Sequence, residues 1–265
     1  MTLSNYTFVF NGTTIGTGTN FLVTNVEGLG GTSPLRIQDD NRGYIDGSYS
    51  GRDFYDERTV YIDVTVLGDN STTAQANYKT LQNAFAPQPI GYYVDPTGLT
   101  PASQQLKLFQ FRLNGNTGDM QMYGRSRGLT TPITPDFAYG YIQTRIMMSF
   151  PDPRYYTDAG TTVTGTSTSL TNAGWATSCP VITINSPSAS GQISDGTVNM
   201  IFQGVPTTGP LIVDLLSRVI YTDGYANRNV MTGTSNGWLA IDPNSTTTWT
   251  STIGSMSTTY RSAYV

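Results

Sequence analysis

The sequence predicts an all-β protein with one helix, divided into two domains. Apolar and polar residues alternate over several short segments, which is the period of a β-strand. Only 12% of the residues are charged, whereas 28 are glycine. Short strands separated by many turns have this composition, and long surface helices do not. The chain has 265 residues, a length that suits two ordinary domains.

The two clearest predicted strands are residues 58–67 and the strand that begins at Tyr141. In each, apolar side chains occupy every second position, so one face suits a core. Pro151 and Pro153 end the second strand, because proline lacks a backbone N–H and restrains the residue before it. Beyond Tyr156 the composition changes to Thr, Gly and Ser. We therefore expect a boundary here, between domains 1–153 and 154–265.

One helix is predicted over residues 72–86, with Thr72 or Thr73 as its cap and Pro87 after its end. Its apolar residues recur at spacings of three and four, so the helix can lie against a sheet. Residues 38–57 are predicted to form a long polar loop, and loops of this length are usually functional.

Residues 106–113 and 120–127 are predicted to pair as a hairpin. Residues 157–172 are predicted to be linker plus a short strand. Many short strands separated by turns then predict a β-sandwich. The further predicted strands are 181–184, 197–202, 211–216, 218–221, 237–241 and 257–265.

The composition excludes several functions. There is no histidine, which rules out Ser-His-Asp and Cys-His catalysis and histidine metal ligands. The formal charge is −4, and no Lys/Arg cluster exists to neutralise phosphates, so direct DNA binding is not expected. Cys179 allows no disulfide within the chain and is expected to be a buried structural thiol. No secretory signal or membrane span is apparent, so we expect a soluble protein made in the cytoplasm.

Acidic and aromatic residues offer a few alternatives. Residues 39–41 with Asp46 could suggest calcium, but the EF-hand pattern is absent and a solvated loop is the better interpretation. Asp56 and Glu57 are adjacent at a strand start and therefore point to opposite faces, unlike a glycosidase acid pair. Asp152 and Arg154 suggest a turn with a local or interface ion pair rather than a catalytic dyad. Sandwich-core packing is favoured over stacking on glycans for three residues, Trp175, Trp238 and Trp249.

Three groups of motifs, taken in order, resemble a known family. The first is 21–23 with 26–29, followed by Asp46-Gly47 and 58–62. The second is 150–156, FPDPRYY. The third is 213–214, 218–221 and Asp223-Gly224, then Trp238, Ile241 and Pro243, with YRSAY at 260–264. The chain resembles the distal tail proteins (Dit family, or phage minor tail proteins) of siphovirus bacteriophages. It departs from the family where Asn244 stands in place of a glycine, but asparagine also accepts positive φ.

The resemblance implies that residues 1–153 form a split β-barrel, the ring-forming belt domain, with helix 72–86. It implies that residues 154–265 form a galectin-like β-sandwich that projects outward. Six copies would form a ring that joins the tail tube to the tip or baseplate hub, with a central channel for DNA. The protein would be part of the virion, at the phage tail tip, after assembly in the host cytoplasm. No catalytic residue, cofactor or metal is implied.

The implied partners are further copies of the chain, the tail tube protein and the tail-tip hub protein, with the tape measure and receptor-binding proteins as further candidates. DNA would be present only in transit, with no membrane insertion. The alternative function is binding of a receptor or carbohydrate through the sandwich. The 38–57 loop and the 114–127 hairpin are candidate ring contacts. Candidate junction residues are Pro151, Asp152, Pro153, Arg154 and Tyr155, and candidate ring-interface residues are Asp46, Gly47, Arg52 and Arg58.

Overall fold

A computed structural model describes residues 2–41, 46, 48, 49, 51, 53–87, 106–114, 118–222, 225, 226 and 228–265. The chain folds into two compact units. Of the described residues, the first unit contains those up to 87, those of 106–155 and Val265, and the second contains 156–264. The units divide between Tyr155 and Tyr156, slightly beyond the boundary that the sequence predicts after Pro153. In the described part of the chain, no helix is both long and apolar enough to span a membrane.

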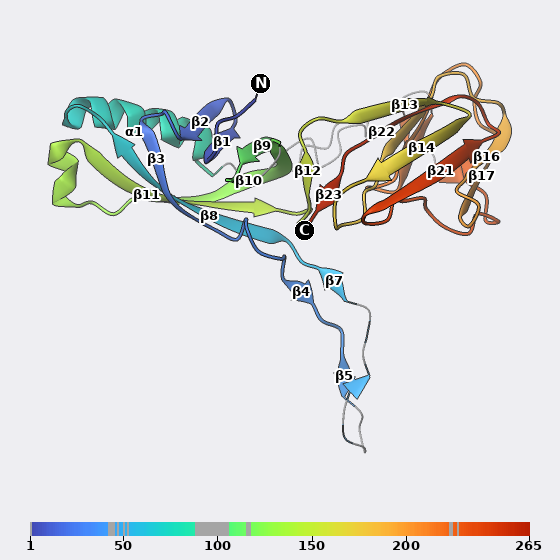
Figure 1. Cartoon of the computed structure of the whole chain (residues 1–265), viewed down its shortest axis with the longest axis horizontal. Coiled ribbons are helices and arrows are strands. Elements are labelled where there is room, and N and C mark those ends of the chain that lie inside the picture. The colour runs from blue at the N-terminus through green and yellow to red at the C-terminus, as the bar shows by residue number, and fades with distance from the viewer. Residues whose placement is uncertain are drawn as a thin grey trace. The chain divides into compact units, whose positions relative to one another are not determined.

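The first unit is an antiparallel sheet with one helix against it (Figure 1). Its strands follow the order β2-β1-β9-β10-β11-β8-β3, an open path rather than a closed ring of paired strands. This confirms the all-β class with one helix. The strands of the path are β1 (Thr7–Phe10), β2 (Thr13–Gly16), β3 (Phe21–Glu27), β8 (Arg58–Leu67), β9 (Lys107–Arg112), β10 (Met120–Thr130) and β11 (Tyr141–Phe150).

Strand β10 joins the strands β2, β1 and β9 to the strands β11, β8 and β3 of this sheet. Its first part, from Met120 to Gly124, pairs with β9, which confirms the predicted hairpin. Its second part pairs with β11, and the register shifts between Ser126 and Gly128. A bulge of this kind bends a strand and increases its twist, so one strand can serve both halves.

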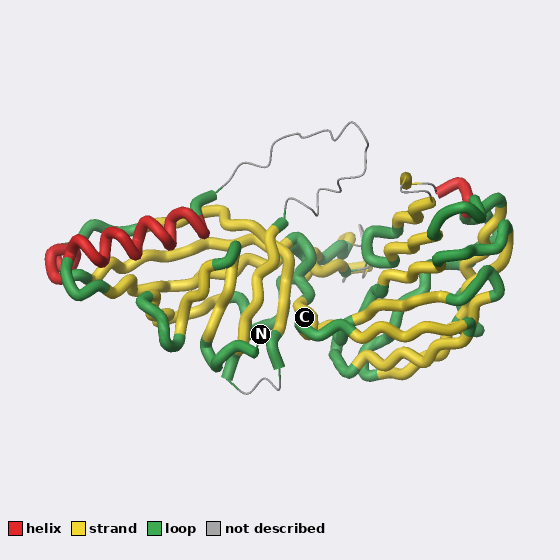
Figure 2. The backbone as a smooth tube through the Cα atoms, turned by 90° about the horizontal axis from the view of Figure 1, so that it is seen from above, coloured by secondary structure: helices red, strands yellow, loops and turns green. Residues whose placement is uncertain are grey.

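Helix α1 (Ser71–Phe85) packs against β2, β8, β10 and β11 (Figure 2). Leu81 and Phe85 are fully buried, and the ring of Phe85 lies 5.1 Å from that of Phe10, centroid to centroid. The hydroxyl of Ser126 donates a hydrogen bond to the carbonyl of Phe85. Strands β8 and β11 contribute further to this core, because their inward side chains are all buried.

The cap of α1 differs from the prediction. Asn70 is the N-cap, and its side-chain oxygen accepts a hydrogen bond of 2.9 Å from the backbone N of Thr73. The predicted caps, Thr72 and Thr73, lie inside the helix. Both residue types can accept this hydrogen bond, so the sequence pattern did not determine which one does.

The predicted 38–57 loop is instead largely a two-stranded arm, so that expectation was wrong. The arm leaves the end of β3 and returns into β8 (Figure 1). Leu35 pairs with Tyr55, and further out Asp40 pairs with Tyr49. The short strands were not predicted because this stretch is rich in glycine and aspartate, which are uncommon in strands. The arm contains β4 (Leu35–Arg36), β5 (Asp40–Asn41), β6 (Ser48–Tyr49) and β7 (Phe54–Tyr55).

The second unit consists of two sheets with the orders β13-β22-β15-β18-β19-β20 and β14-β21-β16-β17. Their inward side chains form one apolar core around Trp249, which is fully buried. This is the predicted sandwich. The unit contains β13 (Thr161–Gly165), β14 (Ser167–Asn172), β15 (Val181–Ile184), β16 (Ser190–Ser194), β17 (Asn199–Gln203), β18 (Leu211–Asp214), β19 (Val219–Thr222), β20 (Tyr225–Ala226), β21 (Ser245–Ser251), β22 (Met256–Tyr260) and β23 (Ala263–Tyr264).

The predicted linker of 157–172 is mostly strand, so this expectation was wrong as well. Strand β12 (Tyr155–Thr157) is followed by β13 and β14. In β14 every second residue is buried, although the segment is rich in Ser and Thr. Hydroxyls bond across the strands, as between Thr171 and Thr246 at 2.9 Å. Such pairs stabilise a solvent face without the apolar signal that sequence analysis detects.

Two further details of the second unit bear on the predictions. The strand predicted at 237–241 is absent, and only an isolated bridge joins Ile241 to Ser178. Asn244 has a φ of +48°, so the turn expected after Pro243 does form. Short 3-10 helices are η2 (Pro135–Tyr139) and η3 (Arg228–Val230).

Candidate functional site

Arg58 does not belong to an exposed interface loop, where the sequence analysis placed it. It is the first residue of β8, and only 1% of it is exposed. Its Nη1 donates to the carbonyls of Gly28 at 2.7 Å and Gly31 at 2.8 Å, and its Nε donates to that of Pro153 at 2.9 Å. Burial lowers the pKa of Arg58 below its ordinary value. Arg58 therefore links the two ends of the arm, where it leaves β3 and where it enters β8, to the junction segment.

The junction residues differ in their surroundings. Pro151 is exposed and Pro153 is buried. Arg154 Nε lies 2.8 Å from Asp152 Oδ1, which is the local ion pair that the sequence predicts. The Tyr155 ring lies 5.7 Å from that of Phe111, and the Arg58 guanidinium lies 5.8 Å from the centre of the Tyr155 ring. Within the first unit, Tyr155 therefore packs between an aromatic ring and a cation.

Of the other candidate ring-interface residues, only Asp46 is described. Asp46 is exposed, whereas Gly47 and Arg52 lie outside the described residues, as does Asp223-Gly224 of the resemblance. Asp39, considered as a calcium ligand, accepts a 3.1 Å hydrogen bond from the backbone N of Gly51. It therefore serves the fold of the arm.

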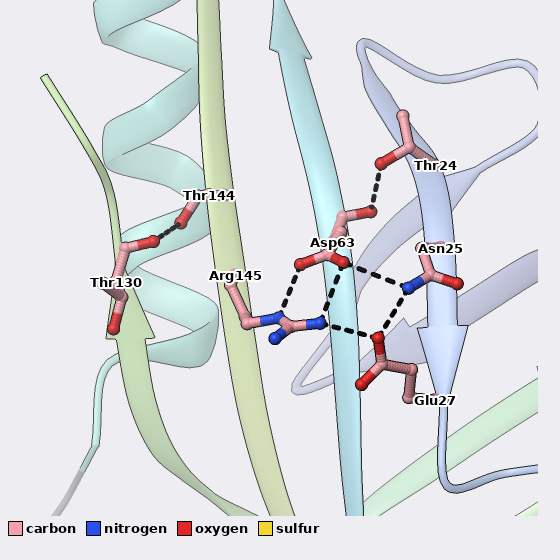
Figure 3. A network of polar contacts seen from close by, with 7 residues as sticks. All are labelled: Thr24, Asn25, Glu27, Asp63, Thr130, Thr144 and Arg145. Carbon is pink, nitrogen blue, oxygen red and sulfur yellow. Dashed lines mark hydrogen bonds and ion pairs between the residues drawn. The ribbon is translucent and has the colours of Figure 1, made fainter. Parts of the chain in front are cut away.

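A polar network that the sequence analysis missed lies on the solvent side of β3, β8 and β11 (Figure 3). Arg145 Nε lies 2.8 Å from Asp63 Oδ1, and its Nη2 lies 3.1 Å from Asp63 Oδ2 and 2.9 Å from Glu27 Oε1. Asn25 Nδ2 donates to both carboxylates, at 2.9 Å to Glu27 and 3.3 Å to Asp63. The hydrogen bond with Asp63 is the largest cause of the raised pKa of Arg145. The sequence shows each residue at an outward position but cannot show that the three strands are neighbours.

The network borders a hollow of about 430 Å³. Each carboxylate is bound to the guanidinium, and the two do not face each other across an open gap, so they are not arranged as a general acid and base. The hydrogen bonds instead link side chains of three neighbouring strands. The hollow is lined by Thr24, Asp63, Val64, Thr65, Pro132, Gln143, Thr144 and Arg145.

Exposed apolar side chains mark two surfaces of the first unit. We define the arm patch as Leu35, Ile37, Phe54 and Tyr55, all of which are exposed. Leu35 and Tyr55 are paired and share one face of the arm, whereas Phe54 pairs with Arg36 and lies on the other face. We define the tip patch as Leu22, Ile133, Tyr139 and Tyr141, at the end of the sheet where β10 connects to β11. Clustered apolar side chains on a surface are typical of interaction sites.

The three tryptophans lie in different surroundings. Trp249 is in the core, and Trp238 is half-buried against it. Trp175 is 55% exposed, with its ring 4.7 Å from that of Tyr264 and nearly perpendicular to it. Cys179 is half-buried against the core, not fully buried as expected.

The described part of the chain thus combines an open antiparallel sheet that carries one helix and an arm with a separate two-sheet sandwich. The Dit protein of phage SPP1, described as a paradigm of the hub adsorption apparatus of phages infecting Gram-positive bacteria, is similar over nearly its full length. The likeness covers 98% of this chain and 99% of that one, with a TM-score of 0.69 and 16% identity. A chain of the phage P2 baseplate, in its activated conformation with Ca, is similar over 97% of both chains, with a TM-score of 0.50 and 8% identity. No family profile and no curated protein matches the sequence significantly. The chain therefore shares the fold of a phage distal tail protein.

Proposed function

We propose that the chain is a structural protein of a bacteriophage tail tip, which forms a hexameric ring between the tail tube and the tip or baseplate hub. The observation that carries this proposal is the likeness to the SPP1 Dit protein, which covers both units with almost no unmatched residues on either side. A chance likeness of one common sheet or sandwich would cover only one unit.

The arm supports assembly into an oligomer. A two-stranded ribbon is marginally stable in water by itself. This arm nevertheless carries four large apolar side chains in the open. Docking on another protein surface would remove them from water and stabilise the ribbon.

The units take different roles in this proposal. The first forms the ring around a central channel for DNA, and the second is the outward sandwich. The partners are other copies of the chain, the tail tube and hub proteins, and also the tape measure and receptor-binding proteins. The protein acts in the virion without catalysis, after assembly in the host cytoplasm.

Light scattering and negative-stain microscopy of the purified protein test the proposal. We expect a mass of six copies and six-fold rings with an open centre. A protein that stays monomeric at high concentration, or forms particles without a channel, would contradict it.

Trp175 favours a second candidate function, the binding of a receptor glycan by the sandwich. An exposed tryptophan beside a tyrosine offers an apolar face to a sugar ring. Trp175→Ala should abolish binding of cell-wall glycans if this function is correct. Unchanged binding, or no binding by the unmodified protein, would exclude it.

A further inference from the structure

The exposed apolar side chains of the first unit are not scattered. Ten large apolar residues of this unit are exposed among the described residues, and eight of them lie in the arm patch or the tip patch. The most exposed are Ile133 at 92%, Tyr139 at 74% and Ile37 at 65%. Apolar side chains with such high solvent exposure, gathered in two separate groups, suggest two binding surfaces.

The two patches lie at opposite ends of β8. The arm returns into Arg58, the first residue of β8, whereas Tyr141 pairs with Leu67, its last residue. Ten residues of strand span about 30 Å. The arm also leads away from the end where β10 connects to β11 (Figure 1). The patches therefore do not cover each other within one copy.

Leu22 extends the tip patch across the sheet. It pairs with Thr65, and Thr65 pairs with Gln143, two residues beyond Tyr141. Leu22 and Tyr141 are both on the solvent side of the sheet. The tip patch is thus made from side chains of β3 and β11 and of the connection between β10 and β11.

We propose that the arm patch of one copy docks on the tip patch of the next copy. Two different surfaces at opposite ends of one unit make a head-to-tail contact, the kind of contact that closes into a ring when the rotation allows. The patches share one chemistry, with aliphatic and aromatic side chains in each, so each can cover the other. This inference rests on the proposed ring and adds which surfaces form its contacts.

Crosslinking between copies tests the contact directly. Ile37→Cys and Ile133→Cys are made separately, each together with Cys179→Ala, and the two proteins are mixed, reassembled and treated with a short bismaleimide. We expect a crosslinked dimer that contains one copy of each variant, identified by mass spectrometry. Thr80→Cys replaces Ile133→Cys in the control, because Thr80 is exposed on α1 and outside both patches. The control mixture should lose this dimer.

The outcomes separate the inference from the proposed function. Six-fold rings without the mixed dimer, or with equal crosslinking to Thr80→Cys, would overturn the docking of arm on tip and leave the ring intact. Crosslinks within Ile37→Cys alone would indicate an arm-to-arm contact and overturn it too. A chain that remains monomeric would contradict both.

Disruption of each patch supplies an independent measurement. Ile37→Asn and Ile133→Asn should each cause loss of rings, with an unchanged circular dichroism spectrum. Thr80→Asn should leave the rings in place. Rings that survive Ile133→Asn would overturn the inference, since this side chain is the most exposed of the tip patch.

Discussion

The Nε atom of Arg58 donates a 2.9 Å hydrogen bond to the backbone carbonyl of Pro153, which lies 95 residues later in the chain. The same side chain binds the turn where the arm begins, through Gly28 and Gly31. Arg58 and Pro153 were predicted as members of two separate sites, an interface and a junction. In the structure they form one internal site, so the arm roots and the junction segment are coupled through a single guanidinium.

Substitution of Arg58 should destabilise the protein strongly. Arg58→Met removes the donors for three carbonyl groups, of which that of Pro153 is buried, where an unsatisfied group costs about 1–3 kcal/mol, whereas Gly28 and Gly31 are exposed and water can replace the lost donor. We expect the free energy of unfolding of the first unit to fall by about 1–3 kcal/mol. Denaturant unfolding measures it. Arg127→Met is the control, because Arg127 is exposed; equal losses for both variants would refute the role of Arg58.

The Arg145 network should contribute a stability that depends on salt. Asp63→Asn removes a bidentate contact on the solvent side, and exposed ion pairs are weakened by screening. The variant should be slightly less stable than the unmodified protein at low salt, and the difference should shrink at high salt. Thermal unfolding at both ionic strengths measures this, with Asp53→Asn, an exposed aspartate of the arm, as the control. A difference that is independent of salt would contradict an electrostatic contribution.

The pH dependence follows from the same arginine. The pKa of Arg145 is raised on folding, first by its hydrogen bond with Asp63, so its contribution is complete below the ordinary arginine pKa and is lost only as the pH rises through the raised value. Arg145→Gln should therefore lower stability by the same amount at pH 6 and pH 9, because both lie far below the ordinary arginine pKa. Thermal unfolding at the two pH values checks this. A loss confined to one of them would show that a different group titrates.

The cap of α1 can be tested with a matched pair. Asn70→Ala removes the side-chain acceptor for the backbone N of Thr73 and should cost about 1 kcal/mol. Thr72→Ala changes an exposed residue inside the helix and should have almost no effect. Denaturant unfolding compares the two, and a larger loss for Thr72→Ala would restore the cap predicted from the sequence.

Two tryptophans of the sandwich should respond differently. Trp249→Ala leaves a cavity in the core and should cost about 3–5 kcal/mol. Trp175→Ala removes a largely exposed ring that contacts Tyr264 at the surface and should cost about 1 kcal/mol or less. Urea unfolding followed by circular dichroism distinguishes them. Similar losses would mean that Trp175 is a core residue too.

Strands with strong apolar alternation could be predicted from the sequence. Residues 58–67 match β8, and residues 181–184 match β15, because branched apolar side chains repeat at the period of a strand. The helix was placed to within one residue at each end, since Pro87 marks its termination. The local ion pair of Asp152 and Arg154 also followed from sequence neighbours alone.

Strands whose sequences lack a clear alternation of apolar and polar residues could not be predicted. Strands β13, β14 and β21 carry Ser and Thr on the solvent side, and their hydroxyls find partners only across the sheet. The arm was predicted to be a loop because its paired residues are well separated along the chain, in a stretch rich in aspartate and glycine.

The sequence by itself determined the all-β class and the main helix, because these depend on periodicity and on proline, which act between near neighbours. Only the tertiary structure decided that Arg58 is buried against Pro153 and that Arg145 lies between Asp63 and Glu27. Arg145 and Asp63 are 82 residues apart in the chain and directly opposite in the sheet. The register of paired strands sets such contacts, and it arises from packing of the whole sheet rather than from any one segment.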